Sequence, residues 1–193
     1  MSVKPNILAF AGSARKGSFN KALVKVASDG ARNTGAEVTV IDFRDFSLPV
    51  YDQDLEAEKG LPAEVLKLKE LFKTHDGFLI SSPEHNGAIT ALLKNVIDWV
   101  SRPAEGEANL ECFRGKVATL MAASPGGLGG LRGLNSVRAI LSGLGTIVLP
   151  DQMAIPAAHS AFDESGALKD TKKNERIQGL GATLAKTIAK LNA

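Results

Sequence analysis

The chain has 193 residues, of which 44% are hydrophobic, and this is enough to bury one complete core, so we expect a single domain over residues 1–193. The formal net charge of +2 is spread along the chain and aromatic residues make up only 5%, which excludes a basic arm or a stacking platform for nucleic acid. The apolar runs are too short to cross a bilayer or to form a signal peptide, and the single cysteine, Cys112, forms no intrachain disulfide. We therefore expect a soluble, cytoplasmic protein without a membrane or nucleic-acid partner.

Apolar runs rich in β-formers alternate with helical patterns along the chain. The predicted strands cover residues 6–11, 37–42, 77–82, 116–123 and 146–149. The predicted helices cover residues 18–32, 62–74, 88–101, 130–141 and 172–191. Most of the strands are continuously apolar, which indicates a sheet covered on both faces, and the alternation with helices predicts a doubly wound, parallel α/β sheet. Residues 48–60, 104–111 and 157–169 lack such patterns and are predicted to be surface loops.

The loop after the first predicted strand reads GSARKGSFN over residues 12–20 and leads directly into a helix. In a sheet of this kind, ligands lie beyond the carboxyl ends of the strands. Ser13, Ser18 and Asn20 offer hydroxyl and amide groups, Arg15 brings a positive charge, and the helix N-terminus adds free N–H groups. A helix cap would need only one of these side chains, so the loop is predicted to bind a phosphate.

The loop lacks residues that three known classes of phosphate-related site require, and this limits the ligands it could bind. A Walker loop places a lysine after its second glycine, but Ser18 follows Gly17. A dinucleotide fingerprint requires glycine at the position of Ala14, and a receiver domain would carry paired acids in place of residues 10–12. These absences disfavour an NTPase, a Rossmann dinucleotide site and a receiver, and they favour a mononucleotide such as FMN.

Two further loops follow strand ends and fit a flat ligand. Residues 83–87 place a proline, a carboxylate, an imidazole, an amide and a glycine in succession, which is more than a helix cap requires. Residues 124–130 read SPGGLGG, and such glycines allow backbone N–H groups to approach a ligand closely, although a flexible turn would explain the glycines equally well. Because all three loops follow strand ends, we expect them to face one another at one edge of the sheet.

These motifs, together with LKNVIDWVSR at residues 93–102, resemble the NAD(P)H-dependent FMN reductase family, whose members include quinone, azo-dye and chromate reductases. The resemblance implies a flavodoxin-like, doubly wound, five-stranded parallel sheet with strand order 2-1-3-4-5. It also implies three groups of FMN-binding residues, which are Ser13, Arg15, Ser18, Phe19 and Asn20 at the phosphate, Pro83, Glu84, His85, Asn86 and Gly87 along the isoalloxazine ring, and Ser124, Gly126 and Gly127 at its other edge. His85 stands where the family usually has tyrosine, and Thr90 where it usually has proline.

The activity implied by this resemblance is a transfer of hydride from NAD(P)H to FMN and then to a quinone, or to an azo dye, chromate or ferric ion. A flat ring that is open on one face above the strand ends leaves no room for nicotinamide and quinone together, so we expect ping-pong kinetics. No catalytic side chain is expected, because the flavin itself carries the hydride chemistry. Two alternatives stay open from sequence: a flavodoxin-type electron carrier, and a flavin-binding regulatory module without turnover. The family also implies a homodimer or a homotetramer built as a dimer of dimers.

Outside the three loops, two residues of the third predicted helix and its end are candidates for a contact role. Trp99 is expected either in the core or at a subunit interface, and Arg102 at a rim where it meets an anionic substrate or a neighbouring subunit. His75, His85 and His159 are far apart in the sequence and show no metal-ligand spacing, so no metal site is expected.

Overall fold

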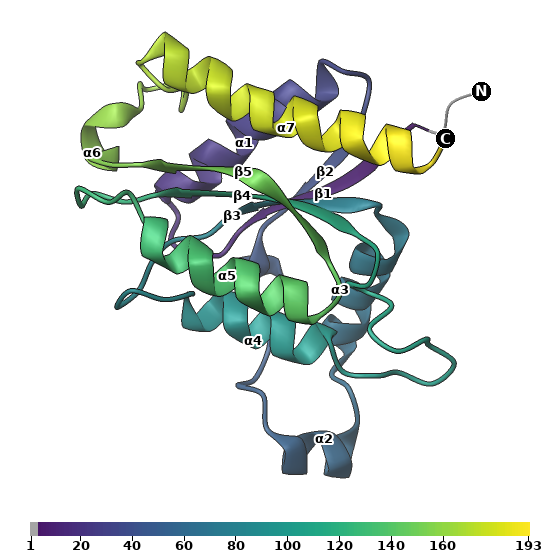
Figure 1. The fold of residues 1–193 in the computed structure, drawn as a ribbon. Helices are drawn as coiled ribbons and strands as arrows, with labels where there is room; N and C mark the ends of the chain where they lie inside the picture. Colours follow the sequence, from purple (N-terminus) through teal and green to yellow (C-terminus); the bar gives the residue numbers. More distant parts are fainter. Residues whose placement is uncertain (1–3) are drawn as a thin grey trace.

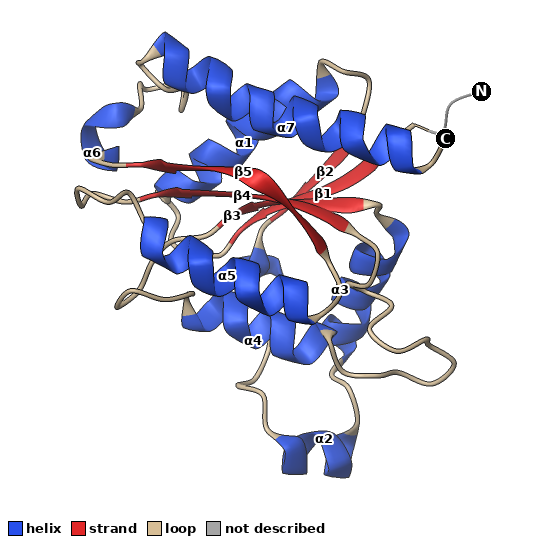
Figure 2. Cartoon of the chain, viewed as in Figure 1, coloured by secondary structure: helices blue, strands red, loops and turns tan. Residues whose placement is uncertain are grey.

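The computed structural model describes residues 4–193 and shows a sheet between two layers of helices (Figures 1 and 2). The five strands are β1 Asn6–Ala11, β2 Glu37–Ile41, β3 Gly77–Ser81, β4 Val117–Ala123 and β5 Ile147–Ile155. All neighbouring strands are parallel, and their order is β2-β1-β3-β4-β5. The predicted fold class and strand order are therefore confirmed.

The two helical layers are formed by helices from different parts of the chain. One face of the sheet is covered by α1 Phe19–Arg32 and α7 Thr171–Leu191, and the other by α3 Ala63–Thr74, α4 Ala91–Val100 and α5 Leu131–Gly143 (Figure 1). Alternate residues of β1 supply the two cores, with Ile7 and Ala9 facing the first layer and Leu8 and Phe10 facing the second. This two-sided burial explains why the central strands are continuously apolar in the sequence.

Two segments predicted as loops contain short helices, so the predictions for residues 48–60 and 157–169 are wrong in part. The two helices are α2 Gln53–Lys59, which projects from the body of the molecule (Figure 1), and α6 Ala158–Ala161. A 3-10 turn, η1 Phe43–Asp45, follows β2. The Asp52 carboxylate caps α2 by accepting from the N–H groups of Asp54 and Leu55. No residue of α2 is buried, so this helix leaves no apolar stripe in the sequence.

The last strand runs to Ile155 instead of ending at residue 149, and this correction affects the site. The apolar run that predicts this strand ends at residue 149, and Pro150, which lacks a backbone donor, follows it. In the structure the pairing of β5 with β4 shifts register, and the Arg138 guanidinium donates to the carbonyl oxygens of Val148 and Leu149 at 3.2 and 2.8 Å. Arg138 thereby gives these carbonyl groups a hydrogen-bond partner beside the register shift, and β5 continues to the sheet edge where β4 also ends.

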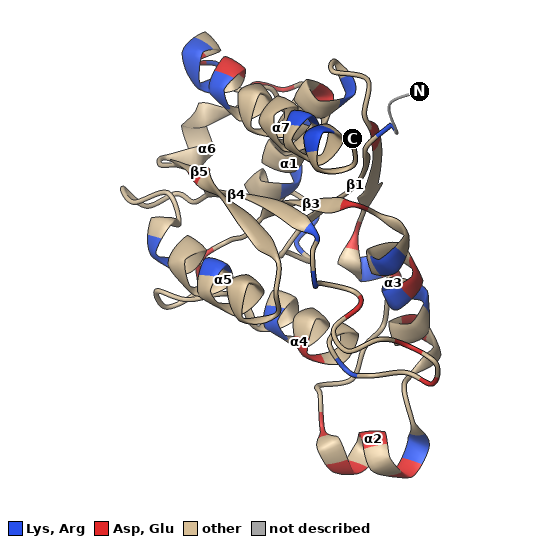
Figure 3. Cartoon of the chain, turned by 45° about the vertical axis from the view of Figure 1, so that its right-hand side comes forward, with Lys and Arg blue, Asp and Glu red and all other residues tan. Residues whose placement is uncertain are grey.

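Charged side chains of both signs are scattered over the helices, and α2 carries mostly acidic ones (Figure 3). Within residues 4–193, no helix combines the length and the apolar character needed to cross a membrane.

Candidate functional site

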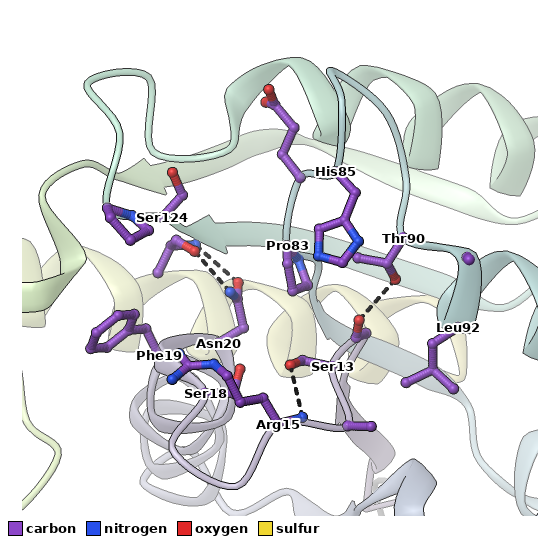
Figure 4. Close-up of a pocket in the computed structure, with 16 residues that line it drawn as sticks. Ser13, Arg15, Ser18, Phe19, Asn20, Pro83, His85, Thr90, Leu92 and Ser124 are labelled. Atoms are coloured by element: carbon purple, nitrogen blue, oxygen red, sulfur yellow. Dashed lines mark hydrogen bonds between the residues drawn. The ribbon is translucent and has the colours of Figure 1, made fainter.

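A cavity of about 580 Å³ opens at the carboxyl ends of β1, β3 and β4, where the three predicted loops meet (Figure 4). The predicted site residues that line it are Ser13, Arg15, Ser18, Phe19, Asn20, Pro83, Glu84, His85 and Ser124. The wall also contains Gly12, Ala14 and Pro125, which belong to the predicted loops without being named as binding residues, and Thr90, Ala91, Leu92 and Ala123, which lie outside those loops. The loops thus form one pocket, although Asn86, Gly87, Gly126 and Gly127 do not line its wall.

Residues 12–20, the predicted phosphate-binding loop, are called the phosphate loop below. Two of its side chains, Arg15 and Ser18, have polar groups without a hydrogen-bond or ion-pair partner in the described chain. Ser18 is the N-cap residue of α1 and is 6% exposed, yet its hydroxyl makes no cap hydrogen bond. Arg15 is exposed, has no carboxylate within ion-pair distance among residues 4–193, and places its guanidinium carbon 5.2 Å from the centre of the Phe19 ring. A cation, a free hydroxyl and a helix N-terminus around one cavity fit a phosphate dianion, which is the group that FMN would bring.

Asn20 behaves differently from the other polar residues of this loop, because its carboxamide is bonded inside the protein. Its Nδ2 donates to the Ala123 carbonyl oxygen at 2.8 Å, and its Oδ1 accepts from the Ala123 N–H and from the Ser81 hydroxyl, both at 2.9 Å. The side chain therefore touches the pocket while its polar atoms tie α1 to the ends of β3 and β4 (Figure 4).

Thr90 is a site residue that the sequence interpretation missed. Its hydroxyl donates to the Gly12 carbonyl oxygen at 2.8 Å and accepts from the Leu93 N–H at 3.2 Å, so it caps α4 and holds the phosphate loop at once (Figure 4). The predicted helix begins at residue 88, which places Thr90 inside it, and this prediction is wrong. A threonine directly before an apolar helical stripe is an N-cap signal, and this signal would have found the residue.

In the loop after β3, the carboxylate of Glu84 is bound within the protein, although the residue also lines the pocket. The Glu84 carboxylate accepts from the Arg132 Nε at 2.8 Å and from the Gly133 N–H at 3.2 Å. Burial raises the pKa of Glu84, but these hydrogen bonds outweigh it, so the pKa lies below its ordinary value. Glu84 is therefore an anion bound to the start of α5.

The next residues of this loop form a tight turn beside the pocket. His85 and Ala88 pair as an isolated antiparallel bridge, and between them Asn86 and Gly87 have φ angles of +52° and +82°. Positive φ at both central positions is typical of a two-residue hairpin turn, which favours an Asn-Gly pair. Turn geometry thus explains Asn86 and Gly87, while His85 is left at the pocket wall (Figure 4).

The glycines of residues 124–130 differ in whether the packing of the chain requires them. At Gly129 φ is +64°, and a Cβ would lie 2.7 Å from the backbone carbon of Ile155, so packing against β5 requires this glycine. At Gly127 a Cβ would meet nothing within 4 Å, and at Gly126 it would meet only the Ser124 hydroxyl at 3.5 Å. Packing within the described chain therefore does not require Gly126 or Gly127. The Gly126 backbone is nevertheless used in the turn, since its N–H donates to the Ser124 hydroxyl oxygen at 3.1 Å and its carbonyl oxygen accepts from the Gly129 N–H at 3.2 Å.

Trp99 and Arg102 lie outside the pocket and hold the segment that carries α2. Trp99 is fully buried and its indole N–H donates to the Pro49 carbonyl oxygen at 2.9 Å. The Arg102 guanidinium pairs with Glu56 at 2.9 Å and lies over the Tyr51 ring. The Arg102 charge is therefore balanced within the chain, and an anionic substrate would compete with Glu56 for it. The predicted substrate and subunit contacts of these two residues stay predictions.

The chain is similar to known proteins over most of its length. A family model described as NADPH-dependent FMN reductase matches residues 5–160. An NAD(P)H-dependent FMN reductase of Pseudomonas aeruginosa is 35% identical over 179 residues, which cover 92% of each chain. A quinone reductase of Escherichia coli is 31% identical over 185 residues, which cover 93% of each chain. The chain belongs to the NADPH-dependent FMN reductase family. It is accordingly an oxidoreductase of a family that uses FMN and takes NAD(P)H as co-substrate.

Solved structures agree with the family in fold. The flavoenzyme NAD(P)H:(acceptor) oxidoreductase FerB from Paracoccus denitrificans has a TM-score of 0.80 and 30% identity, with 96% of this chain and 98% of that chain covered. A flavodoxin from an archaeon has a TM-score of 0.62 at 13% identity, with 95% of this chain and 98% of that chain covered. The second comparison shows the shared fold alone.

Proposed function

We propose that this member of the FMN reductase family is an NAD(P)H:quinone reductase that holds FMN in the pocket at the ends of β1, β3 and β4. The observation that carries the proposal is the Arg15 guanidinium without a carboxylate partner among residues 4–193 and the Ser18 hydroxyl without a cap hydrogen bond, both in the wall of that pocket. The bound flavin would supply the redox chemistry, which is uptake of hydride from NAD(P)H and delivery of electrons to an acceptor. The quinone reductases among the relatives support a quinone as that acceptor.

The chain's own part is to bind and orient. Arg15 neutralises the phosphate charge, and Ser13 and Ser18 offer hydroxyl groups to its oxygens. Pro83 and His85 border the ring from one side, and we propose that the turn at residues 124–127, of which Ser124 lines the cavity, lies at its other edge. The proton that quinone reduction consumes besides the hydride would come from water, so no side chain needs to exchange a proton in this scheme, and Glu84 stays bound to Arg132.

The place of the pocket supports an order of binding. The cavity lies at one edge of the sheet, so a flavin ring held there would offer donor and acceptor the same approach. We therefore propose that NAD(P)H and the quinone take turns. Azo dyes, chromate and ferric ion are proposed as further acceptors, and a homodimer or a dimer of dimers as the assembly.

Steady-state kinetics test this proposal. Initial rates of NAD(P)H oxidation at several fixed quinone concentrations should give parallel double-reciprocal lines, with each substrate inhibiting competitively at high concentration. Intersecting lines would require both substrates in the pocket together and would contradict the shared route. A protein that binds FMN but oxidises no NAD(P)H with any acceptor would instead be an electron carrier or a regulatory module.

A further inference from the structure

One side chain of the phosphate loop connects all three loops of the pocket. Asn20 lies in the first turn of α1, Ser81 is the last residue of β3, and Ala123 is the last residue of β4. The Asn20 carboxamide makes three hydrogen bonds of 2.8 to 2.9 Å, with the N–H and carbonyl of Ala123 and with the Ser81 hydroxyl. None of the three residues is more than 4% exposed.

The position of these bonds ties the phosphate end of the pocket to its ring end. Pro83 follows Ser81 by two residues, and Ser124 follows Ala123 directly. A displacement of Asn20 therefore moves the residues that border the ring as well as the start of α1. A carboxamide has two N–H donors and one carbonyl oxygen, so the three bonds leave a single N–H group for any ligand.

We propose that Asn20 is a positioning residue that sets the spacing of the three loops. Arg15 and Ser18, not Asn20, then make the pocket bind FMN more tightly than riboflavin, which lacks the phosphate. The proposal rests on FMN occupying the pocket, as proposed above. Without the carboxamide, the Ala123 backbone groups and the Ser81 hydroxyl lose their partners inside the protein. Because unpaired buried polar groups are costly, the ends of β3 and β4 will shift or admit water, and the whole pocket will change shape.

Paired measurements with FMN and riboflavin separate positioning from phosphate binding, because riboflavin lacks the phosphate. In Asn20→Ala we expect both flavins to bind more weakly by a similar factor, on the order of tenfold. In Arg15→Ala we expect FMN alone to lose affinity, by roughly ten- to a hundredfold. The visible circular dichroism of the bound flavin should change in Asn20→Ala, since the ring loops move.

Two further variants serve as controls. Ser28→Ala removes a buried hydrogen bond of α1, from the Ser28 hydroxyl to the Val24 carbonyl at 2.8 Å, outside the pocket. It should lower the melting temperature and leave both flavin affinities unchanged. Ser81→Ala removes one partner of Asn20 without touching the pocket, and it should weaken both flavins equally but less than Asn20→Ala. This variant keeps the test decisive if Asn20→Ala does not fold.

Loss of FMN affinity in Asn20→Ala with unchanged riboflavin affinity would overturn the proposal and make Asn20 a direct phosphate ligand. Unchanged binding of both flavins in Ser81→Ala and Asn20→Ala would also overturn it. Failure of the unaltered chain to bind either flavin is a different result, because it would overturn the proposed function together with this inference.

Discussion

At the scale of single residues, the site separates polar groups that are free from those that the fold uses. Arg15 and the Ser18 hydroxyl are free within the described chain, whereas Asn20 and Glu84 are bonded to backbone or to a partner side chain. All four belong to motifs that stand out in the sequence. Their residue types cannot reveal this difference, because it depends on elements that lie 48 to 103 residues away in the chain.

His85 offers a test of the ring end of the pocket. It lines the cavity close to Pro83 and Thr90, on the loop that follows β3 (Figure 4). We expect His85→Tyr, which restores the usual residue of the family, to change KM for the quinone about two- to tenfold, the size of one altered hydrogen bond. FMN affinity should change less than KM. The matched control is His159→Tyr on α6, outside this pocket, which should change neither. A large loss of FMN in His85→Tyr would contradict this placement of the loop.

His75 predicts a pH dependence of stability. Its Nδ1 lies 2.6 Å from the Leu71 carbonyl oxygen, and its buried Nε2 has no partner among the described residues. Protonation would place an N–H donor at Nε2 without an acceptor, and burial accordingly lowers the pKa of His75 below 6.5.

The sign of this effect follows from proton binding. When the folded pKa is lowered, the unfolded chain binds the proton first, so the stabilising contribution is present above pH 6.5 and is lost as pH falls through the folded pKa. We expect the free energy of unfolding, measured with urea, to fall as the pH is lowered below about 6.5, and to fall less in His75→Gln. Equal slopes in the two proteins would contradict this assignment.

At the scale of elements, the close crossing of α1 and α7 explains how the C-terminal helix is fixed. A Cβ at Gly181 would overlap the Ala27 carbonyl oxygen, and one at Gly30 would overlap the Gln178 carbonyl oxygen. Glycine at both positions allows the two backbones to touch. This crossing covers one face of the sheet, and α7 lies beyond the residues that the family model matches.

Two glycines of α7 give a controlled measurement of this packing. We expect Gly181→Ala to lower the free energy of unfolding by about 1–3 kcal/mol or more, because the helices must separate. A methyl group at Gly179 would meet nothing within 4 Å, so Gly179→Ala should raise the free energy of unfolding by up to about 1 kcal/mol through helix propensity. Equal effects of the two substitutions in chemical denaturation would show that the crossing is not tight.

The elements that could be predicted from the sequence are those that bury an apolar stripe or run. The strands and long helices have such patterns, and their positions agree with the structure to within a few residues at most ends. α2 buries nothing, and the extension of β5 depends on Arg138, whose guanidinium binds carbonyl groups 10 and 11 residues away. Such contacts depend on tertiary structure and leave no periodic signal.

At the scale of the whole molecule, the parallel sheet is what creates the site. It brings Asn20 beside Ser81 and Ala123, which are 61 and 103 residues away in the chain. The sequence could predict this convergence, because strand ends of a doubly wound sheet share one edge. The bond from Thr90 to Gly12, 78 residues away, could not be predicted, because an N-cap signal gives the start of a helix but not its tertiary partner.

The central claim, that this chain holds FMN and moves electrons from NAD(P)H to a quinone in two separate steps, is tested most directly by an anaerobic titration of the FMN-loaded protein. We predict that NAD(P)H alone bleaches the flavin absorbance stoichiometrically, and that quinone restores the absorbance after the nicotinamide has been removed. Flavin that stays oxidised until NAD(P)H and quinone are present together would contradict the claim.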